Sequence, residues 1–139
     1  MKVLLSIKPE YAEKIFSGEK KYEYRRKLFR RSGVSSIVIY VTQPVGLIIG
    51  EFEIADVIEG VPEELWEGTK DYSGISKKFF IKYFGGSKRG YAIKVGNVKK
   101  YRESIDPYAF QPNFVPPQSY RYLKDQGLFG FDSLPQAVS

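Results

Sequence analysis

The residues best suited to chemistry lie between Lys20 and Arg31. This segment holds seven lysines and arginines against one acid, Glu23, and aromatic residues are interleaved with the charges. Basic side chains neutralise phosphates and aromatic rings stack on bases, so the composition suits a nucleic-acid surface. Lysines and arginines on an edge strand also keep other chains from pairing with it. Composition alone favours neither interpretation.

Within this segment, Glu23 and Arg25 lie two positions apart on a predicted strand, so their side chains point to the same side and can form a charge-assisted pair. The pair could be structural. As a site, Arg25 would offer its fork to a phosphate or a base edge while Glu23 accepted from an amine. Lys20 has cationic neighbours in Lys21 and Arg25, which would lower its pKa and make it a candidate base or nucleophile.

A second polar group follows the prolines near the C-terminus, where Gln118 and Ser119 stand directly after Pro116 and Pro117. A rigid backbone reduces the entropy lost when polar groups bind a ligand. Spacing alone favours a different interpretation for Ser119, as the cap of a helix over 119–126. The aromatic run 79–84 and Trp66 are expected to form core or a lid.

Local patterns predict the elements that position these residues. Pro9 opens a helix and Gly18 closes it, so the basic segment begins where this helix ends. Further helices are predicted from Pro62 and over 76–84, and the proline-rich stretch after Asp106 should wrap the domain in extended form. Strands are predicted over 3–7, 20–26, 36–42, 47–58 and 91–98. Because helices and strands do not strictly alternate, the fold class is α+β, a small, mainly antiparallel barrel.

Length and composition indicate one domain over residues 1–139, with a core of about 3–123 and a C-terminal tail, 127–139, whose last residues from Asp132 should be mobile. The chain has 139 residues, 42% of them hydrophobic, and a formal net charge of +6, which should attract polyanions. The N-terminus has no signal-peptide or membrane-span pattern, so we expect a cytoplasmic protein without a membrane partner.

The chain has no cysteine and no histidine. This excludes disulfides, the usual zinc ligands and catalytic pairs of serine or cysteine with histidine. We therefore expect no metal and no cofactor, and any chemistry must use lysine, carboxylate or hydroxyl groups.

Several blocks of the sequence resemble the ASCH domain (activating signal cointegrator homology) of the PUA-like superfamily. The resemblance covers roughly residues 3–123. It is carried by the run from Leu4 to Ile15 followed by Gly18-x-Lys20-x-x-Glu23-x-Arg25, and by the later blocks 39–42, 49–52, 83–86, 91–93 and 117–120.

The local patterns sum to five to six strands with three to four short helices, and the resemblance implies that they form a PUA-like β-barrel with a cleft beside the first helix. It further implies binding of RNA or a nucleotide, linked to translation or transcription. Lys20, Glu23 and Arg25 would line the cleft. Strict strand alternation would send Lys20 to the opposite side, so we expect it in the bend after Gly18.

Our leading hypothesis is a binding module whose partner is RNA or a nucleotide. The residues expected to bind are Lys20, Tyr22, Glu23, Arg25, Arg26, Gln118 and Ser119. Other ASCH proteins resemble modified-cytidine amidohydrolases or metal-independent ribonucleases, which implies an alternative in which Lys20 and Glu23 are catalytic and Tyr22 and Ser119 assist. A third possibility is a protein-interaction domain. The sequence leaves open whether the protein is an enzyme, and it does not define the oligomeric state.

Overall fold

The first strand and helix form where the local sequence predicts them. The structure, a computed structural model, describes residues 1–123 and 137–138. In it β1 spans Lys2–Ile7 and α1 spans Pro9–Ser17, with proline in the first helical turn and Gly18 in the left-handed conformation at φ 88°. Ala12 and Ile15 are buried on the helix face that meets the sheet. The predicted helix and both of its end signals are confirmed.

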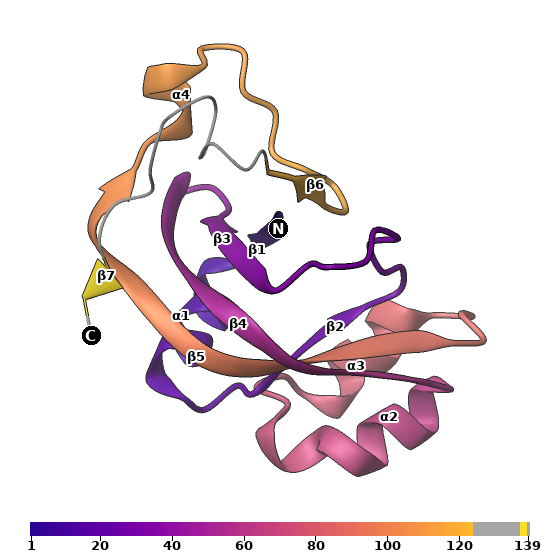
Figure 1. Ribbon diagram of the computed structural model, residues 1–139. Helices are drawn as coiled ribbons and strands as arrows, with labels where there is room; N and C mark the ends of the chain where they lie inside the picture. Colours follow the sequence, from indigo (N-terminus) through magenta and orange to yellow (C-terminus); the bar gives the residue numbers. More distant parts are fainter. Residues whose placement is uncertain (124–136, 139) are drawn as a thin grey trace.

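A curled sheet forms the body of the molecule (Figure 1). Its strand order is β2-β5-β4-β3-β1-β6, with β7 paired to β5. The strands β1 and β3 are parallel, and every other pair in the described residues is antiparallel. The predicted α+β class with a mainly antiparallel sheet is confirmed, as a half-barrel. The remaining bounds are β2 Tyr22–Arg25, β3 Ser36–Val41, β4 Leu47–Gly60, β5 Gly90–Ile105, β6 Arg121–Tyr122 and β7 Ala137–Val138.

The curl follows from the two long strands. The register between β4 and β5 shifts at three places, near Ile48, Phe52 and Ile54. An extra residue on one strand bends it and increases its twist, so successive shifts roll the sheet around its core. The predicted strand ends at Val98, whereas β5 continues to pair with β4 as far as Ile105. The sequence does not indicate this extension, because most side chains over 99–103 are charged and exposed.

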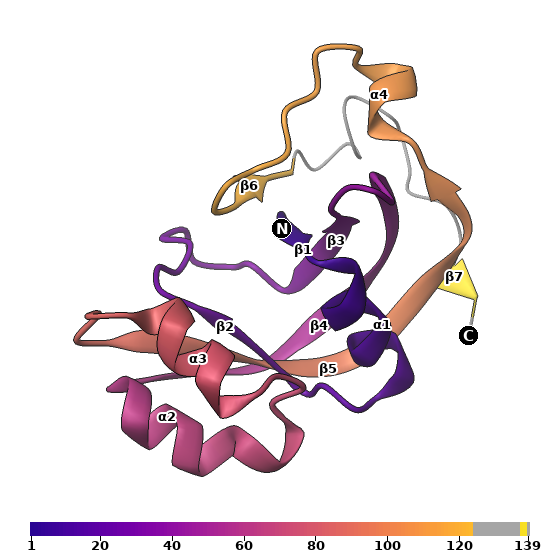
Figure 2. The ribbon, with the colours of Figure 1, turned by 180° about the vertical axis from the view of Figure 1, so that it is seen from behind.

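Helices cover one face and one end of this sheet. Figure 2 shows α1 and α3 (Lys77–Phe84) on the same face, with α2 (Pro62–Thr69) and the short helix η1 (Lys70–Tyr72) at the lower end. Phe80 and Phe84 of α3 are buried against Tyr24 of β2, whose ring meets that of Phe80 edge-on at 4.9 Å. None of the helices in residues 1–123 is both long and apolar enough to cross a membrane.

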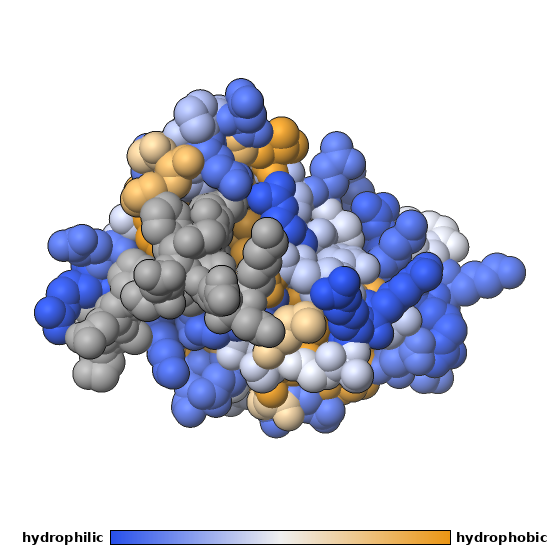
Figure 3. All heavy atoms as spheres, turned by 45° about the horizontal axis from the view of Figure 1, so that its top comes forward, coloured by the Kyte–Doolittle hydropathy of each residue, from blue (hydrophilic) through white to orange (hydrophobic). Residues whose placement is uncertain are grey.

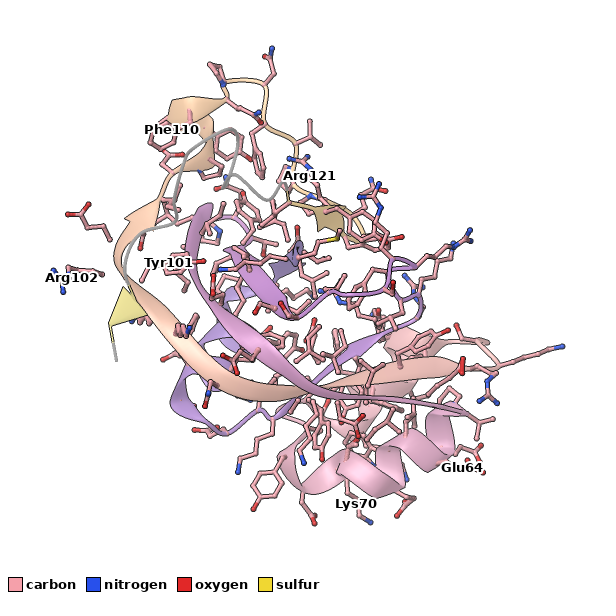
Figure 4. The ribbon with its side chains drawn as sticks, viewed as in Figure 1. Glu64, Lys70, Tyr101, Arg102, Phe110 and Arg121 are labelled. Carbon is pink, nitrogen blue, oxygen red and sulfur yellow. The ribbon has the colours of Figure 1, made fainter. Side chains whose placement is uncertain are left out.

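The segment 106–120, here called the strap, passes over the upper end of the sheet as predicted, but in largely irregular rather than extended form. It contains one helical turn, α4 (Pro107–Phe110), capped by the Asp106 side chain. Arg121 holds the strap, since its Nη2 donates to the Val115 carbonyl at 2.7 Å and its guanidinium lies over the Phe114 ring (Figure 4). Apolar side chains reach the surface at this end of the molecule (Figure 3).

The C-terminal predictions need correction. A helix over 119–126 is wrong within the described residues, because Arg121–Tyr122 form β6 and pair with Leu4 and Val3 of β1. This edge of β1 offers backbone partners that a helix would leave unused. In the tail, Ala137–Val138 form β7 on β5, a strand that is not among the predicted ones. Residues 124–136 and 139 lie outside the described part.

The buried hydroxyl pair behind β2 predicts a measurable contribution to stability. Tyr24 Oη lies 2.6 Å from Thr69 Oγ1, which itself donates to the Leu65 carbonyl. Tyr24→Phe should reduce the free energy of unfolding by about 1 kcal/mol, because the Thr69 oxygen loses its donor while the ring packing stays. Urea denaturation measures the loss. Tyr72→Phe, at a half-exposed ring, is the control and should change stability by less than about 0.5 kcal/mol.

Candidate functional site

A pocket opens where α1, β2 and α3 meet. Its volume is about 220 Å³. The start of α1 contributes one wall, α3 contributes a second, and the residues around β2 form the floor; we call this cavity the Lys20 pocket. Its lining residues are Ser6, Ile7, Lys8, Tyr11, Lys20, Glu23, Tyr24, Arg25, Ile75, Phe79 and Tyr83.

Lys20 lies in the bend between Gly18 and the start of β2, as expected, and its side chain enters the same pocket as Glu23 and Arg25. The residue is 1% exposed. Its ammonium donates to the Ser73 carbonyl at 2.6 Å, and its Nζ lies 4.0 Å from Glu23 Oε1. The same nitrogen lies 5.0 Å from the Tyr24 ring centroid, within range of a cation–π contact. These contacts hold the Lys20 side chain in one position.

The loop that closes over Lys20 depends on Gly74. This glycine has φ +68°, a conformation that other residues rarely adopt, and a Cβ there would lie 2.5 Å from the Lys20 Cβ. Its carbonyl also accepts from the Lys14 ammonium at 3.2 Å. The loop can therefore press its backbone against the Lys20 stem and keep water from it.

Burial lowers the pKa of Lys20 from 10.5 to about 8. Desolvation of the ammonium is the main cause; the charges of Lys14 and Arg25 lower the pKa further, while the Glu23 carboxylate raises it. The direction agrees with the sequence-based expectation, but the principal cause does not. Lys21 was expected to crowd Lys20, yet its own ammonium lies over the Tyr72 ring at 4.4 Å.

Glu23 and Arg25 form the pair that strand alternation predicted. Arg25 Nη2 donates to Glu23 Oε2 at 2.9 Å and to the Ser6 carbonyl at 3.0 Å. The Nε of Arg25 is buried and has no hydrogen-bond partner among the described residues. An unpaired buried donor costs about 1–3 kcal/mol, so this N–H is a group that an incoming acceptor could satisfy.

The other predicted site residues divide into two groups. Tyr22 does not line the Lys20 pocket, and its side chain packs against the aromatic cluster under α2 and α3. Arg26, Gln118 and Ser119 line a second hollow of about 560 Å³, which also touches Arg25. Lys20, Glu23 and Arg25 thus lie together in one pocket, and Arg26, Gln118 and Ser119 line the neighbouring hollow. Tyr22 lines neither of them.

Sequence reasoning missed the aromatic walls. Phe79 and Tyr83 lie four positions apart on α3 and both face the pocket, whereas Phe80 and Phe84 face the core. The sequence-based prediction places the whole run 79–84 in core or lid and does not separate these two pairs. The i, i+4 spacing could have separated the two pairs, but four aromatic residues in six positions cover both faces of a short helix. Tyr11, on the facing wall, meets Phe79 at a ring-centroid distance of 5.5 Å.

Comparison with known proteins identifies the family. The family model described as the ASCH domain matches residues 5–114, most of the chain. The chain belongs to the ASCH domain family. This ASCH domain is 29% identical over 125 residues to an ASCH domain-containing ribonuclease from Zymomonas mobilis, a match that covers 88% of this chain and 84% of that protein.

Other relatives differ in how much of their length the domain spans. It is 29% identical over 123 residues to the ATP synthase subunit alpha of Ureaplasma parvum, but spans only 15% of that protein. Among solved structures, the crystal structure of ASCH from Zymomonas mobilis superimposes with a TM-score of 0.82 at 28% identity, covering 90% of this chain and 89% of that one. The half-barrel is therefore the fold of an ASCH protein.

The surroundings of Lys20 predict how its pKa responds to substitution. In the wild-type protein, Lys20 should titrate near pH 8, well below the ordinary lysine pKa of 10.5. Glu23→Gln should lower this pKa further, since it removes a carboxylate that favours the ammonium, and Arg25→Ala should raise it, since it removes a neighbouring cation. Titration of the lysine Cε signals by NMR between pH 6 and 11 measures both shifts. A Lys20 midpoint near 10.5 would show that the ammonium is solvated.

Proposed function

We propose that this ASCH domain binds RNA or a nucleotide, with a base entering the Lys20 pocket. The observation that carries the proposal is the convergence of Lys20, Glu23 and Arg25 on one small cavity with aromatic walls. A carboxylate accepts from the exocyclic amine of a base, while a guanidinium donates to its ring nitrogens or carbonyl. The Arg25 Nε, which has no partner among the described residues, supplies such a donor.

The size of the pocket supports a single base as occupant. Its volume of about 220 Å³ is below the ~300 Å³ at the lower end of most ligand pockets. A base can enter only if it leaves its stack, which happens readily in single-stranded RNA and at the ends of helices. Rings at Tyr11, Phe79 and Tyr83 offer the apolar and stacking surface that a base prefers over water.

The surface around the pocket supports an anionic ligand. Beyond Arg25 the chain continues with Arg26, Lys27, Arg30 and Arg31, and the formal net charge is +6. Such a field raises the rate at which a polyanion is captured. The ribonuclease name of the Zymomonas relative agrees with RNA as the ligand. A link of this binding to translation or transcription is part of the proposal and follows from the family resemblance alone.

The proposal predicts salt-sensitive binding of short, labelled single-stranded RNA, measured by fluorescence anisotropy. The affinity should fall as salt rises, because each phosphate contact releases counterions. Lys20→Ala with Arg25→Ala should weaken binding by about 100-fold, since each charged hydrogen bond contributes about 1.5–3 kcal/mol. The matched control, Lys99→Ala with Arg102→Ala, removes the same two residue types from an exposed part of β5 and should lower the affinity less than about threefold.

Two results would overturn the proposal. One is failure of the wild-type protein to bind RNA at low micromolar concentration in low salt. The other is an equal loss of affinity in the two double variants, which would reduce the role of Lys20 and Arg25 to general attraction. Thermal unfolding of every variant shows whether a loss of binding reflects a loss of folding.

A second candidate function is catalysis on the bound nucleotide, favoured by the low pKa of Lys20. About one tenth of an amine with a pKa of about 8 is neutral at pH 7, and a neutral amine can accept a proton from water or from a ribose hydroxyl. Glu23, at 4.0 Å from the Lys20 Nζ, could relay that proton. The phenol would come from Tyr11 rather than Tyr22, since Tyr11 lines the pocket and Tyr22 does not.

Catalysis predicts product formation that rises with pH through about 8, because the deprotonated Lys20 is the active form. Short RNA and acylated cytidine are incubated with the protein between pH 6 and 9, and mass spectrometry follows ribonuclease and amidohydrolase products respectively. Lys20→Ala should remove the activity, whereas Lys99→Ala should leave it unchanged. If no product forms from either substrate, or if product persists after Lys20→Ala, the pocket binds without transforming its ligand.

A further inference from the structure

Two hollows lie side by side and share a wall. The Lys20 pocket and the larger hollow of about 560 Å³ are both lined by Arg25 and Tyr83. We call the larger one the second hollow. Its remaining lining residues are Arg26, Lys27, Ser87, Gln118 and Ser119. A ligand that fills the Lys20 pocket is therefore adjacent to a further cavity that a single base would leave empty.

The two hollows differ in charge. The Lys20 pocket has three cationic side chains, from Lys8, Lys20 and Arg25, but it also contains the Glu23 carboxylate, which pairs with Arg25 and would repel a phosphate. The described lining of the second hollow has three cationic side chains, from Arg25, Arg26 and Lys27, together with hydroxyl and amide groups, and no carboxylate. A phosphate is thus favoured in the second hollow and a base in the first.

The wall between the hollows is held in place by specific contacts. The backbone N–H of Arg26 donates to Tyr83 Oη at 3.1 Å, and the Arg26 guanidinium lies 5.0 Å from the centre of the same ring. Tyr83 thereby fixes the start of the basic segment against α3.

The opposite side of the second hollow is tied to the pocket through Ser6. The Ser6 carbonyl accepts from Arg25, and its hydroxyl donates to the Pro117 carbonyl at 2.7 Å. Pro117 directly precedes Gln118 and Ser119, so the polar end of the strap is held at a fixed place relative to Arg25. Prolines at 116 and 117 limit the freedom that this end would otherwise lose on binding.

We propose that the second hollow binds the backbone phosphate next to the nucleotide whose base occupies the Lys20 pocket, so that the ligand is single-stranded RNA of at least two nucleotides rather than a free nucleoside. This inference rests on the proposed RNA binding and says which residues contact each part of the nucleotide. Arg26 and Lys27 contact the phosphate, and Gln118 and Ser119 donate to it or to the adjoining ribose. Arg25 lies between base and phosphate, which explains why it lines both cavities.

The test compares two ligand classes on three proteins by calorimetry: a mixed-sequence RNA tetranucleotide, and the four nucleosides, which carry no phosphate. The proteins are the wild type, Arg26→Ala with Lys27→Ala, and the control Arg30→Ala with Arg31→Ala. The control removes two charges from the same segment at positions that line neither hollow. We expect the first double variant to bind the tetranucleotide at least about tenfold more weakly, with nucleoside binding unchanged, and the control to lose less than about threefold.

The outcomes separate this inference from the proposed function. If the wild type binds no tetranucleotide, RNA binding itself fails, and the inference fails with it. If the tetranucleotide binds but both double variants weaken it equally, the basic segment only attracts RNA and the second hollow is not a phosphate site. Equal affinity of the wild type for a nucleoside and for the tetranucleotide would overturn the inference as well. A salt slope smaller in the Arg26/Lys27 variant than in the control supports it, since each lost phosphate contact removes about 0.7 from the slope.

Discussion

The enclosure of one ammonium, that of Lys20, is the constraint on which the rest of the site depends. Removing a charged group from water costs several kcal/mol unless other groups replace the lost hydration. Here the replacements come from three separate parts of the chain: the Ser73 carbonyl, the Glu23 carboxylate and the rings that flank the nitrogen. Because each must lie close to one atom, α1, β2 and the loop after η1 are fixed relative to one another. The cavity beside them is a consequence of that arrangement.

The same constraint extends outward through hydrogen bonds. Glu23 keeps its orientation because Arg25 donates to it, and Arg25 is anchored in turn on the Ser6 carbonyl. The Ser6 hydroxyl then holds the strap at Pro117. A short series of polar contacts therefore runs from the most buried charge to the exposed end of the strap. A ligand that moves Arg25 would therefore also disturb the contacts of Glu23 and of Ser6. This would couple the proposed recognition of a base to that of a phosphate.

Sequence reasoning succeeded where the deciding forces are local. Proline and glycine mark the two ends of α1, and alternation on β2 places Glu23 beside Arg25, as the structure confirms. It failed where distant residues decide. The low pKa of Lys20 is due mainly to burial, and the loop that contributes to it lies more than fifty positions along the chain. Likewise β6 forms where a helix was predicted, and Tyr122 of β6 accepts from the backbone of Arg30, 92 positions away.

The cations in this region are of two kinds, exposed and buried. The exposed ones suit general attraction of a polyanion, and the buried one suits recognition of a specific group. Arg26 and Lys27 are exposed and lose little hydration on folding, which suits a site for backbone phosphates. Lys20 is buried and its pKa is lowered to about 8; the same burial makes it a poorer ligand for a phosphate and costs stability. The buried Lys20 is therefore better suited to contacting a base or transferring a proton than to binding a backbone phosphate. In the proposed function, the exposed cations would attract an RNA strand to the surface, and the buried lysine would contact the one nucleotide that enters the pocket.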